Sequence, residues 1–107
     1  MAQSQDRAQW LAIQALDGRE LDFKLYQLSC QWTNRPTDAA AFEAGYEQGR
    51  FHFSEDAAFL ADLVSQFELR LQLLAGEWLA STDQHGQYGK TPLEAACRVV
   101  LAINGIA

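Results

Sequence analysis

The clearest hydrophobic pattern lies in the last part of the chain. Thr91-Pro92-Leu93-Glu94 is typical of a helix start, because the Thr91 hydroxyl can accept a hydrogen bond from the first turn and Glu94 can reach back to the amide of the capping residue. Pro92 suits the first helical position, since the N–H that it lacks has no partner there. From here to Asn104 the helix is apolar almost all round, which requires burial on most sides. The sequence therefore predicts layers packed around this helix.

The period of the pattern changes to two in the segment before that helix. Leucine alternates with polar residues over 68–74, and a second alternating segment, 77–82, follows a short turn with Trp78 and Ala80 at its inward positions. Alternation is typical of half-buried strands, so the two segments predict an antiparallel hairpin. The polar, glycine-bearing residues 83–90 are expected to form a loop that leads to the last helix.

Residues 17–32 carry two competing signals. Asp-Gly at 17–18 between apolar runs is a hairpin signal, whereas Asp17 with Glu20 is also a helix cap with its reciprocal partner. Four apolar residues recur at helical spacing and favour the helix: Leu21, Leu25, Leu28 and Trp32. The opposite face is apolar as well, which predicts that neighbouring elements cover this helix on two sides.

The middle of the chain predicts shorter elements. A weaker helix is expected over 38–48 with Gly49 as its stop, followed by a short strand at 50–53. Ser54 is expected to cap the next helix, which carries one apolar stripe. Residues 1–9 are polar and are expected to be frayed.

These elements predict a single α+β domain over residues 1–107: an α-β-α sandwich with helices on both sides of a small antiparallel sheet. The chain has the length of one domain, and a hydrophobic content of 49% suits a globular core. A sheet of two or three strands has open edges. We therefore expect a homo-oligomer such as a homodimer, formed by pairing edge strands or by burying apolar helix surface.

The charge balance bears on the class of partner. The formal net charge is −6 and the isoelectric point about 4.7, which disfavours a nucleic-acid binder because that class needs clustered Lys and Arg. Acidic residues concentrate in 38–62, where they form either a solvated helix face or a docking face for a basic protein. The candidate contact residues are Asp38, Glu43 and Glu47 from this segment, and Tyr88 as the aromatic residue expected to be exposed.

Cysteine usage and hydropathy bear on the compartment. Cys30 and Cys97 lie far apart in apolar surroundings, which is typical of reduced, buried cysteine rather than of a disulfide framework. No apolar run approaches the ~18 residues that a membrane span needs. Residues 1–6 lack the basic start and apolar core of a secretion signal. We expect a cytoplasmic protein that binds no membrane.

One string resembles a nucleotide site. Gly89-Lys90-Thr91 stands between a strand and a helix, which is the setting of a phosphate-binding loop, and helix amides attract anions. The earlier glycine of that motif would fall where this chain has Gln84, and Thr91 suits the helix cap better. Binding of a small molecule, nucleotide or phosphate by residues 83–91 is therefore the alternative function.

Other catalytic and metal-binding patterns are weak. The two histidines, His52 and His85, have no histidine one turn away, so a metal site would need ligands from distant segments. Asp83 and His85 are residue types used in hydrolysis, but no nucleophile-elbow setting accompanies them. Arg98 lies one turn after Glu94, which predicts an ion pair on the helix surface. We expect no metal, no cofactor and no enzymatic activity, and a weak hydrolase around Asp83 and His85 is the remaining catalytic hypothesis.

Four short motifs resemble the phage ABA sandwich domain family, and NinX-like phage proteins have a similar layout. The motifs are GRELD at 18–22, FSEDAA at 53–58, WLA at 78–80 and GKTPLEAACR at 89–98. The resemblance covers residues 17–30 and 53–104, and it implies an α-β-α sandwich encoded by a phage or prophage, with no known activity and no catalytic residues. Together with the charge, it predicts a small acidic accessory protein that binds a host or phage protein in the host-cell cytoplasm.

Overall fold

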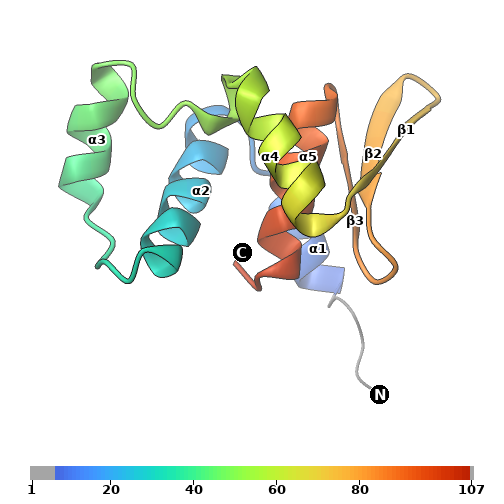
Figure 1. Ribbon diagram of the computed structural model, residues 1–107, viewed down its shortest axis with the longest axis horizontal. Coiled ribbons are helices and arrows are strands. Elements are labelled where there is room, and N and C mark those ends of the chain that lie inside the picture. Colours follow the sequence, from blue (N-terminus) through green and yellow to red (C-terminus); the bar gives the residue numbers. More distant parts are fainter. Residues whose placement is uncertain (1–6, 107) are drawn as a thin grey trace.

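The computed structural model describes residues 7–106. Its elements in chain order are α1 (Arg7–Gln14), α2 (Gly18–Trp32), α3 (Ala39–Glu47), a short 3₁₀ helix η1 (Phe53–Glu55), α4 (Ala57–Phe67), β1 (Arg70–Leu74), β2 (Glu77–Ser81), β3 (Gly86–Gly89) and α5 (Pro92–Ile103). Figure 1 shows α5 between the sheet on one side and the helices α2 and α4 on the other.

Helix α5 is the centre of the fold, as its sequence predicted. Its residues from Leu93 to Ala102 are buried except for Glu94. They pack with Leu21 and Leu28 of α2, Leu63 of α4 and Ala80 of β2 in one apolar core. An all-round apolar helix loses its contact with water only when neighbours surround it, and this arrangement provides them on all sides.

The sheet has three antiparallel strands in the order β1-β2-β3. Ala75 and Gly76 connect β1 to β2 and both have positive φ, which is the geometry of a tight two-residue hairpin turn. The hairpin predicted at 68–74 and 77–82 is confirmed, with each strand slightly shorter. Residues 86–89 form a third strand inside the segment predicted to be a loop, and that part of the prediction is wrong.

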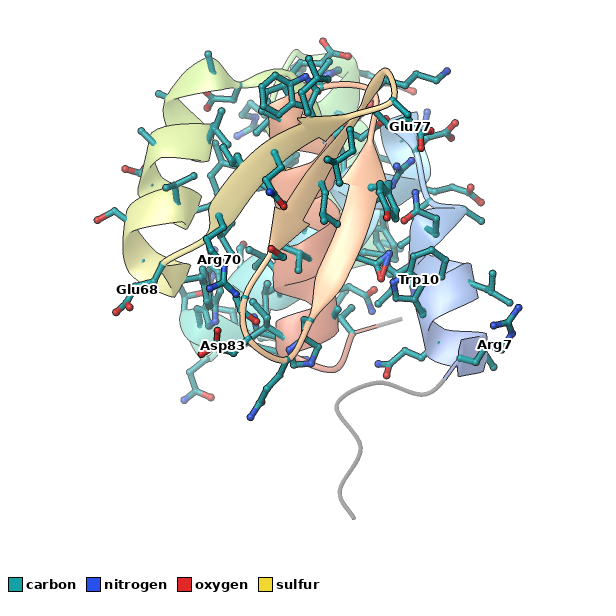
Figure 2. All side chains as sticks on the ribbon, turned by 90° about the vertical axis from the view of Figure 1, so that its right-hand side faces the viewer. Arg7, Trp10, Glu68, Arg70, Glu77 and Asp83 are labelled. Carbon is teal, nitrogen blue, oxygen red and sulfur yellow. The ribbon has the colours of Figure 1, made fainter. Side chains whose placement is uncertain are left out.

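The predicted α+β class is confirmed, and the helices are distributed unevenly about the sheet. The sheet forms one end of the molecule, with α5 against one of its faces and α1 beside β3 (Figures 1 and 2). Helix α2 lies on the side of α5 away from the sheet, α4 packs against α5, and α3 lies at the far end. The outward face of the sheet is the one seen in Figure 2, and no helix among residues 7–106 overlies it.

A second, mainly aromatic cluster joins α2 to α3. Tyr26 and Cys30 of α2 meet Phe42 of α3, and the ring of Phe51 packs 4.9 Å from that of Tyr26. Phe51 lies directly over Gly45 of α3, where a Cβ atom would overlap the ring. This cluster covers the second apolar face of α2, opposite the face that packs in the main core. The prediction that α2 is covered on two sides is therefore confirmed.

The predicted helices at 17–32 and 38–48 are confirmed as α2 and α3, so the hairpin reading of Asp-Gly at 17–18 is wrong. Asp17 occupies the cap position of α2 but its side chain makes no capping hydrogen bond. Gly49, the predicted stop of α3, follows its end with a positive φ.

Three local predictions are wrong. Residues 50–53 form no strand, because Phe51 adopts a positive φ to place its ring on α3. Ser54 does not cap α4; Asp56 does, by accepting from the amide of Ala58 at 3.0 Å. Residues 7–9 are helical within α1, and the expected fraying of 1–6 concerns residues outside those described.

Candidate interaction surface

Strand β3 lies directly against the start of α5. A methyl group on Gly89 would meet the backbone of Ala95, with its Cα only 2.9 Å away. Gly89 is therefore needed for close backbone packing, which is a structural use of glycine at helix–strand contacts.

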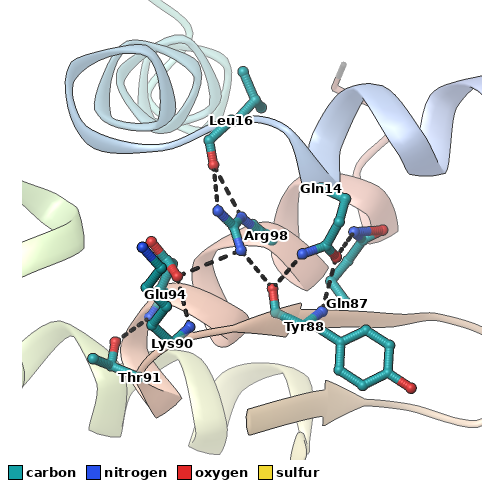
Figure 3. A network of polar contacts seen from close by, with 8 residues as sticks. All are labelled: Gln14, Leu16, Gln87, Tyr88, Lys90, Thr91, Glu94 and Arg98. Atoms are coloured by element: carbon teal, nitrogen blue, oxygen red, sulfur yellow. Dashed lines mark hydrogen bonds and ion pairs between the residues drawn. The ribbon is translucent and has the colours of Figure 1, made fainter. Parts of the chain in front are cut away.

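The first turn of α5 satisfies its own amides. Thr91 Oγ1 accepts from Glu94 N at 3.1 Å, and Glu94 Oε1 accepts from Lys90 N at 2.7 Å (Figure 3). The predicted capping box is confirmed, except that Glu94 reaches the amide of Lys90 rather than that of Thr91. A carboxylate thus stands where the phosphate alternative would place its anion, and the contacts of Gly89, Lys90 and Thr91 give that alternative no support.

Arg98 lies inside the fold rather than on the helix surface. Only 7% of the residue is exposed. Its guanidinium donates twice to Leu16 O, at 3.0 and 2.7 Å, and once to Tyr88 O at 2.6 Å (Figure 3). The predicted ion pair with Glu94 forms at 3.4 Å, but between a buried arginine and a half-buried glutamate, so the prediction of a surface pair is wrong. Arg98 joins α5 to β3 and to the segment between α1 and α2.

Side chains of α1 occupy the free edge of β3. In an antiparallel sheet, alternate residues direct their N–H and C=O groups to the same edge. The bond from Thr82 N to His85 O, at 2.9 Å, shows that His85 faces β2. Gly86 and Tyr88, at the alternate positions, therefore direct their backbone groups away from β2.

Those outward groups are bonded by Trp10 and Gln14. Trp10 Nε1 donates to Gly86 O at 2.6 Å. The Gln14 side chain accepts from Tyr88 N and donates to Tyr88 O, both at 2.9 Å (Figure 3). The Gln14 amide thus makes the pair of bonds that a neighbouring strand would make, and this edge of the sheet is closed to a further strand.

The edge of β1 is different. The two-residue turn makes Leu74 and Glu77 the closing hydrogen-bonded pair, so Leu71 and Leu73 direct their N–H and C=O groups away from β2. In the described part of the chain, no hydrogen bond to these four groups is found. Leu73 and Leu74 are 58% and 40% exposed, respectively. This edge presents unpaired backbone beside exposed leucine.

The outward face of the sheet continues that apolar surface. Leu79 and Tyr88 are directly opposed on β2 and β3 and are half-buried. The Tyr88 ring meets Trp10 edge-on at 6.4 Å between centroids, and Figure 2 places Trp10 at the β3 side of this face. We call the β1 edge, with Leu73 and Leu74, and this face together the open sheet surface.

The sequence-predicted contact residues do not gather in one place. Asp38 caps α3 by accepting from Ala40 N and Ala41 N at 3.0 and 3.2 Å. Glu43 forms an ion pair with Arg19 of α2, and Glu47 lies exposed at the end of α3. Helix α3 and the sheet are at opposite ends of the molecule, so Tyr88 belongs to a different surface (Figure 1).

A hollow of about 600 Å³ opens beside η1, lined by Gly49, Phe51, His52, Phe53, Glu55 and Asp56. Two of its polar side chains serve the local structure. His52 Nε2 lies 3.0 Å from Tyr46 O, and Asp56 caps α4. Asp83, part of the hydrolase hypothesis, instead pairs with Arg70 at 3.0 Å.

Within residues 7–106, no three metal-binding side chains gather in one place.

Cys30 and Cys97 are free and buried, as predicted. Burial, together with the nearby carboxylates of Asp22 and Glu94, raises the pKa of the Cys97 thiol well above its usual range. A thiol held protonated in this way is a packing group.

Asp22 and Tyr46 form a polar pair between α2 and α3. Asp22 is fully buried and accepts from the Tyr46 hydroxyl at 2.9 Å and from Ser54 N at 2.8 Å. Burial and the Asp22 carboxylate raise the pKa of Tyr46 to about 12. The folded protein therefore holds this phenolic proton more tightly than the unfolded chain does.

An alkaline titration tests this pair. The stabilising effect of the Tyr46 proton is complete below the unfolded pKa of 10.0 and is lost as pH rises from there toward about 12. In Tyr46→Phe, we expect the step of tyrosinate absorbance near pH 12 to disappear and stability to fall less steeply over this pH window. An unchanged step near pH 12 in the variant would contradict the assignment.

Sequence reasoning did not find the residues that distinguish the two sheet edges. The apolar residues 10–16 carry no clear local signal for an element, yet Trp10 and Gln14 of α1 close β3. A signal for the open edge was present: Leu73-Leu74 places leucine on both faces at the end of one strand.

Comparison of the chain with protein-family models, with curated proteins and with solved structures gives no match. The resemblance to the phage ABA sandwich family therefore stays a prediction.

Among residues 7–106, no helix is both long and apolar enough to cross a membrane.

Proposed function

We propose that this protein is a small accessory protein, of the kind encoded by phages or prophages, that acts in the host-cell cytoplasm by binding another protein and carries out no catalysis. The observation that supports this is the contrast between the two sheet edges. Trp10 and Gln14 close the β3 edge, while the β1 edge keeps unpaired backbone groups at Leu71 and Leu73.

Strand addition is the binding mode that suits this edge. A partner strand would form hydrogen bonds with the outward N–H and C=O groups of Leu71 and Leu73, which would provide affinity. Its contacts with the neighbouring side chains would provide specificity. Edge strands are commonly protected by charge, proline or a covering element. Here Arg70 is the one charged residue of β1, and the strand ends in two exposed leucines.

The acidic segment supports a protein partner as well. Glu47 is exposed at the end of α3, opposite the sheet, and Glu43 on the same helix is paired with Arg19. We assign this helix a secondary role, as a contact for basic groups of a partner large enough to reach it. A partner no longer than a single strand would contact the open sheet surface alone.

Site-specific photo-crosslinking in the host cell tests this proposal. With a photoreactive amino acid in place of Leu74, we expect a covalent adduct with another protein chain. The same group in place of Leu11, which is 50% exposed on α1, serves as the control for exposure and is expected to give no such adduct.

A second substitution identifies the role of the backbone. Leu73→Pro removes an N–H that points away from β2, so it is tolerated on an edge strand but blocks pairing. We expect it to abolish the adduct, whereas Leu73→Thr, which keeps the N–H, preserves it. Equal adducts from positions 74 and 11, or none at 74, would refute the proposed docking edge.

A further inference from the structure

We infer that the β1 edge pairs with β1 of a second copy of this chain, antiparallel and with the twofold axis at Gln72. The two three-stranded sheets would then join into one sheet of six strands. This inference rests on the proposed docking role of β1 and names the occupant of that edge.

The register follows from the backbone. Leu71 and Leu73 carry the outward N–H and C=O groups, so an antiparallel copy uses all of them only when Leu71 lies opposite Leu73 of the other copy. By symmetry the reverse pair forms too, and four hydrogen bonds result. Gln72 then faces its own counterpart in a non-hydrogen-bonded pair, where Cα atoms approach to about 4.5 Å.

The side chains are self-complementary in this register. On the helix side of the sheet, Leu73 of one copy would lie beside Leu71 of the other, which is half-buried against the core. This contact would cover the leucine that is 58% exposed in the single chain. On the outward face, Arg70 would lie opposite Leu74 of the other copy, where its methylene stem covers apolar surface.

The two charged strand residues at the hairpin ends are of opposite sign. Arg70 lies near the start of the hairpin and Glu77 at its tip, as Figure 2 shows, and both side chains are on the outward face. Antiparallel pairing brings Arg70 of one copy next to the Leu74–Glu77 pair of the other. The present Arg70–Asp83 ion pair does not oppose this, because its side chains are 61% and 91% exposed and such pairs are weak.

Repulsion between two acidic chains is limited by geometry. Each copy has a formal net charge of −6, but the acids of α3 lie at the end of the molecule away from the sheet (Figure 1). Separations well beyond the Debye length of about 8 Å at physiological salt are largely screened. Among the charged residues of β1 and β2 themselves, Arg70 of one copy and Glu77 of the other are the nearest, and they attract.

Cysteine cross-linking of the purified protein tests the register. In Gln72→Cys, the paired Cα atoms, about 4.5 Å apart, fall within the range of a disulfide, so mild oxidation is expected to give a covalent dimer. Leu74→Cys alone is expected to give none, because position 74 faces position 70. Mixing Leu74→Cys with Arg70→Cys is expected to give the mixed dimer. The natural Cys30 and Cys97 are buried and free, and the unsubstituted chain provides their background.

Sedimentation analysis of the unsubstituted protein is the second measurement. We expect a concentration-dependent dimer that Leu73→Pro converts to monomer and Leu73→Thr retains. A protein that stays monomeric up to about 1 mM overturns the inference. So does a Gln72→Cys variant that forms no dimer beyond background. If a different protein is nevertheless captured at position 74 in cells, the proposed docking edge stands and only its occupant changes.

Discussion

Replacing Arg98 by methionine is expected to lower the free energy of unfolding by about 3 kcal/mol. The side chain is 7% exposed and its guanidinium makes three hydrogen bonds to backbone carbonyls. Methionine fills similar space but donates no hydrogen bond, so Leu16 O loses both guanidinium bonds and Tyr88 O keeps only Gln14. The half-buried Glu94 carboxylate also loses its counter-charge. Denaturant unfolding monitored by circular dichroism measures the loss.

Two variants separate the contributions to this loss. Arg98→Lys keeps the positive charge but lacks the planar fork that reaches two carbonyls, so we expect it to recover only part of the stability. Glu94→Gln removes the ion pair while keeping an acceptor for Lys90 N, and is expected to cost much less than Arg98→Met. If Arg98→Met cost less than about 1 kcal/mol, the guanidinium would not be the link described above.

The elements that sequence predicted well are those whose signals are local. The start of α5 is encoded by Thr91 and Glu94, which lie within one turn of each other and make the expected capping bonds, though Glu94 bonds a neighbouring amide. The hairpin is encoded by alternation and by Ala75-Gly76 at the turn. In each case the residues that determine the geometry are adjacent in the chain, so a short pattern is sufficient.

The elements that sequence missed depend on distant residues. β3 consists of Gly-Gln-Tyr-Gly, which has weak strand propensity, and its outer edge is completed by Gln14, 74 positions away from Tyr88. Phe51 has a positive φ because its ring packs on Gly45, which no local pattern records. Ser54 and Asp56 are both good capping residues, and the position of η1 decides between them.

The local roles of the acidic residues could not be predicted for a related reason. The charge pattern indicated Asp38, Glu43 and Glu47 as contact residues, and the structure shows that Asp38 caps α3 and that Glu43 pairs with Arg19. Whether a polar side chain is engaged locally is a question of geometry, not of composition. The distinction between an open and a closed sheet edge is likewise absent from the strand sequences, since it depends on where α1 lies.

Substituting Gly89 by alanine is expected to lower the free energy of unfolding by about 3 kcal/mol, near the upper end for overpacked sites. The added methyl group would overlap the backbone nitrogen of Ala95 and lie 2.9 Å from its Cα. Neither atom belongs to a side chain that can rotate away, so β3 or the first turn of α5 has to move. That movement would strain the bonds from Arg98 and Gln14 to Tyr88, which lies beside Gly89.

Gly86→Ala, at the other end of the same strand, is the matched control. A methyl group there would meet Leu79 Cδ1 at 3.5 Å, an ordinary van der Waals contact. We expect this variant to be close to the unsubstituted protein in stability, because an alanine in a strand also loses less backbone entropy on folding than a glycine. Thermal and denaturant unfolding of the two variants give the comparison directly. Equal losses of stability in the two variants would mean that β3 does not pack against α5 at backbone contact. A large loss of stability in Gly89→Ala alone would show that the closed edge of the sheet depends on this close packing against the buried helix.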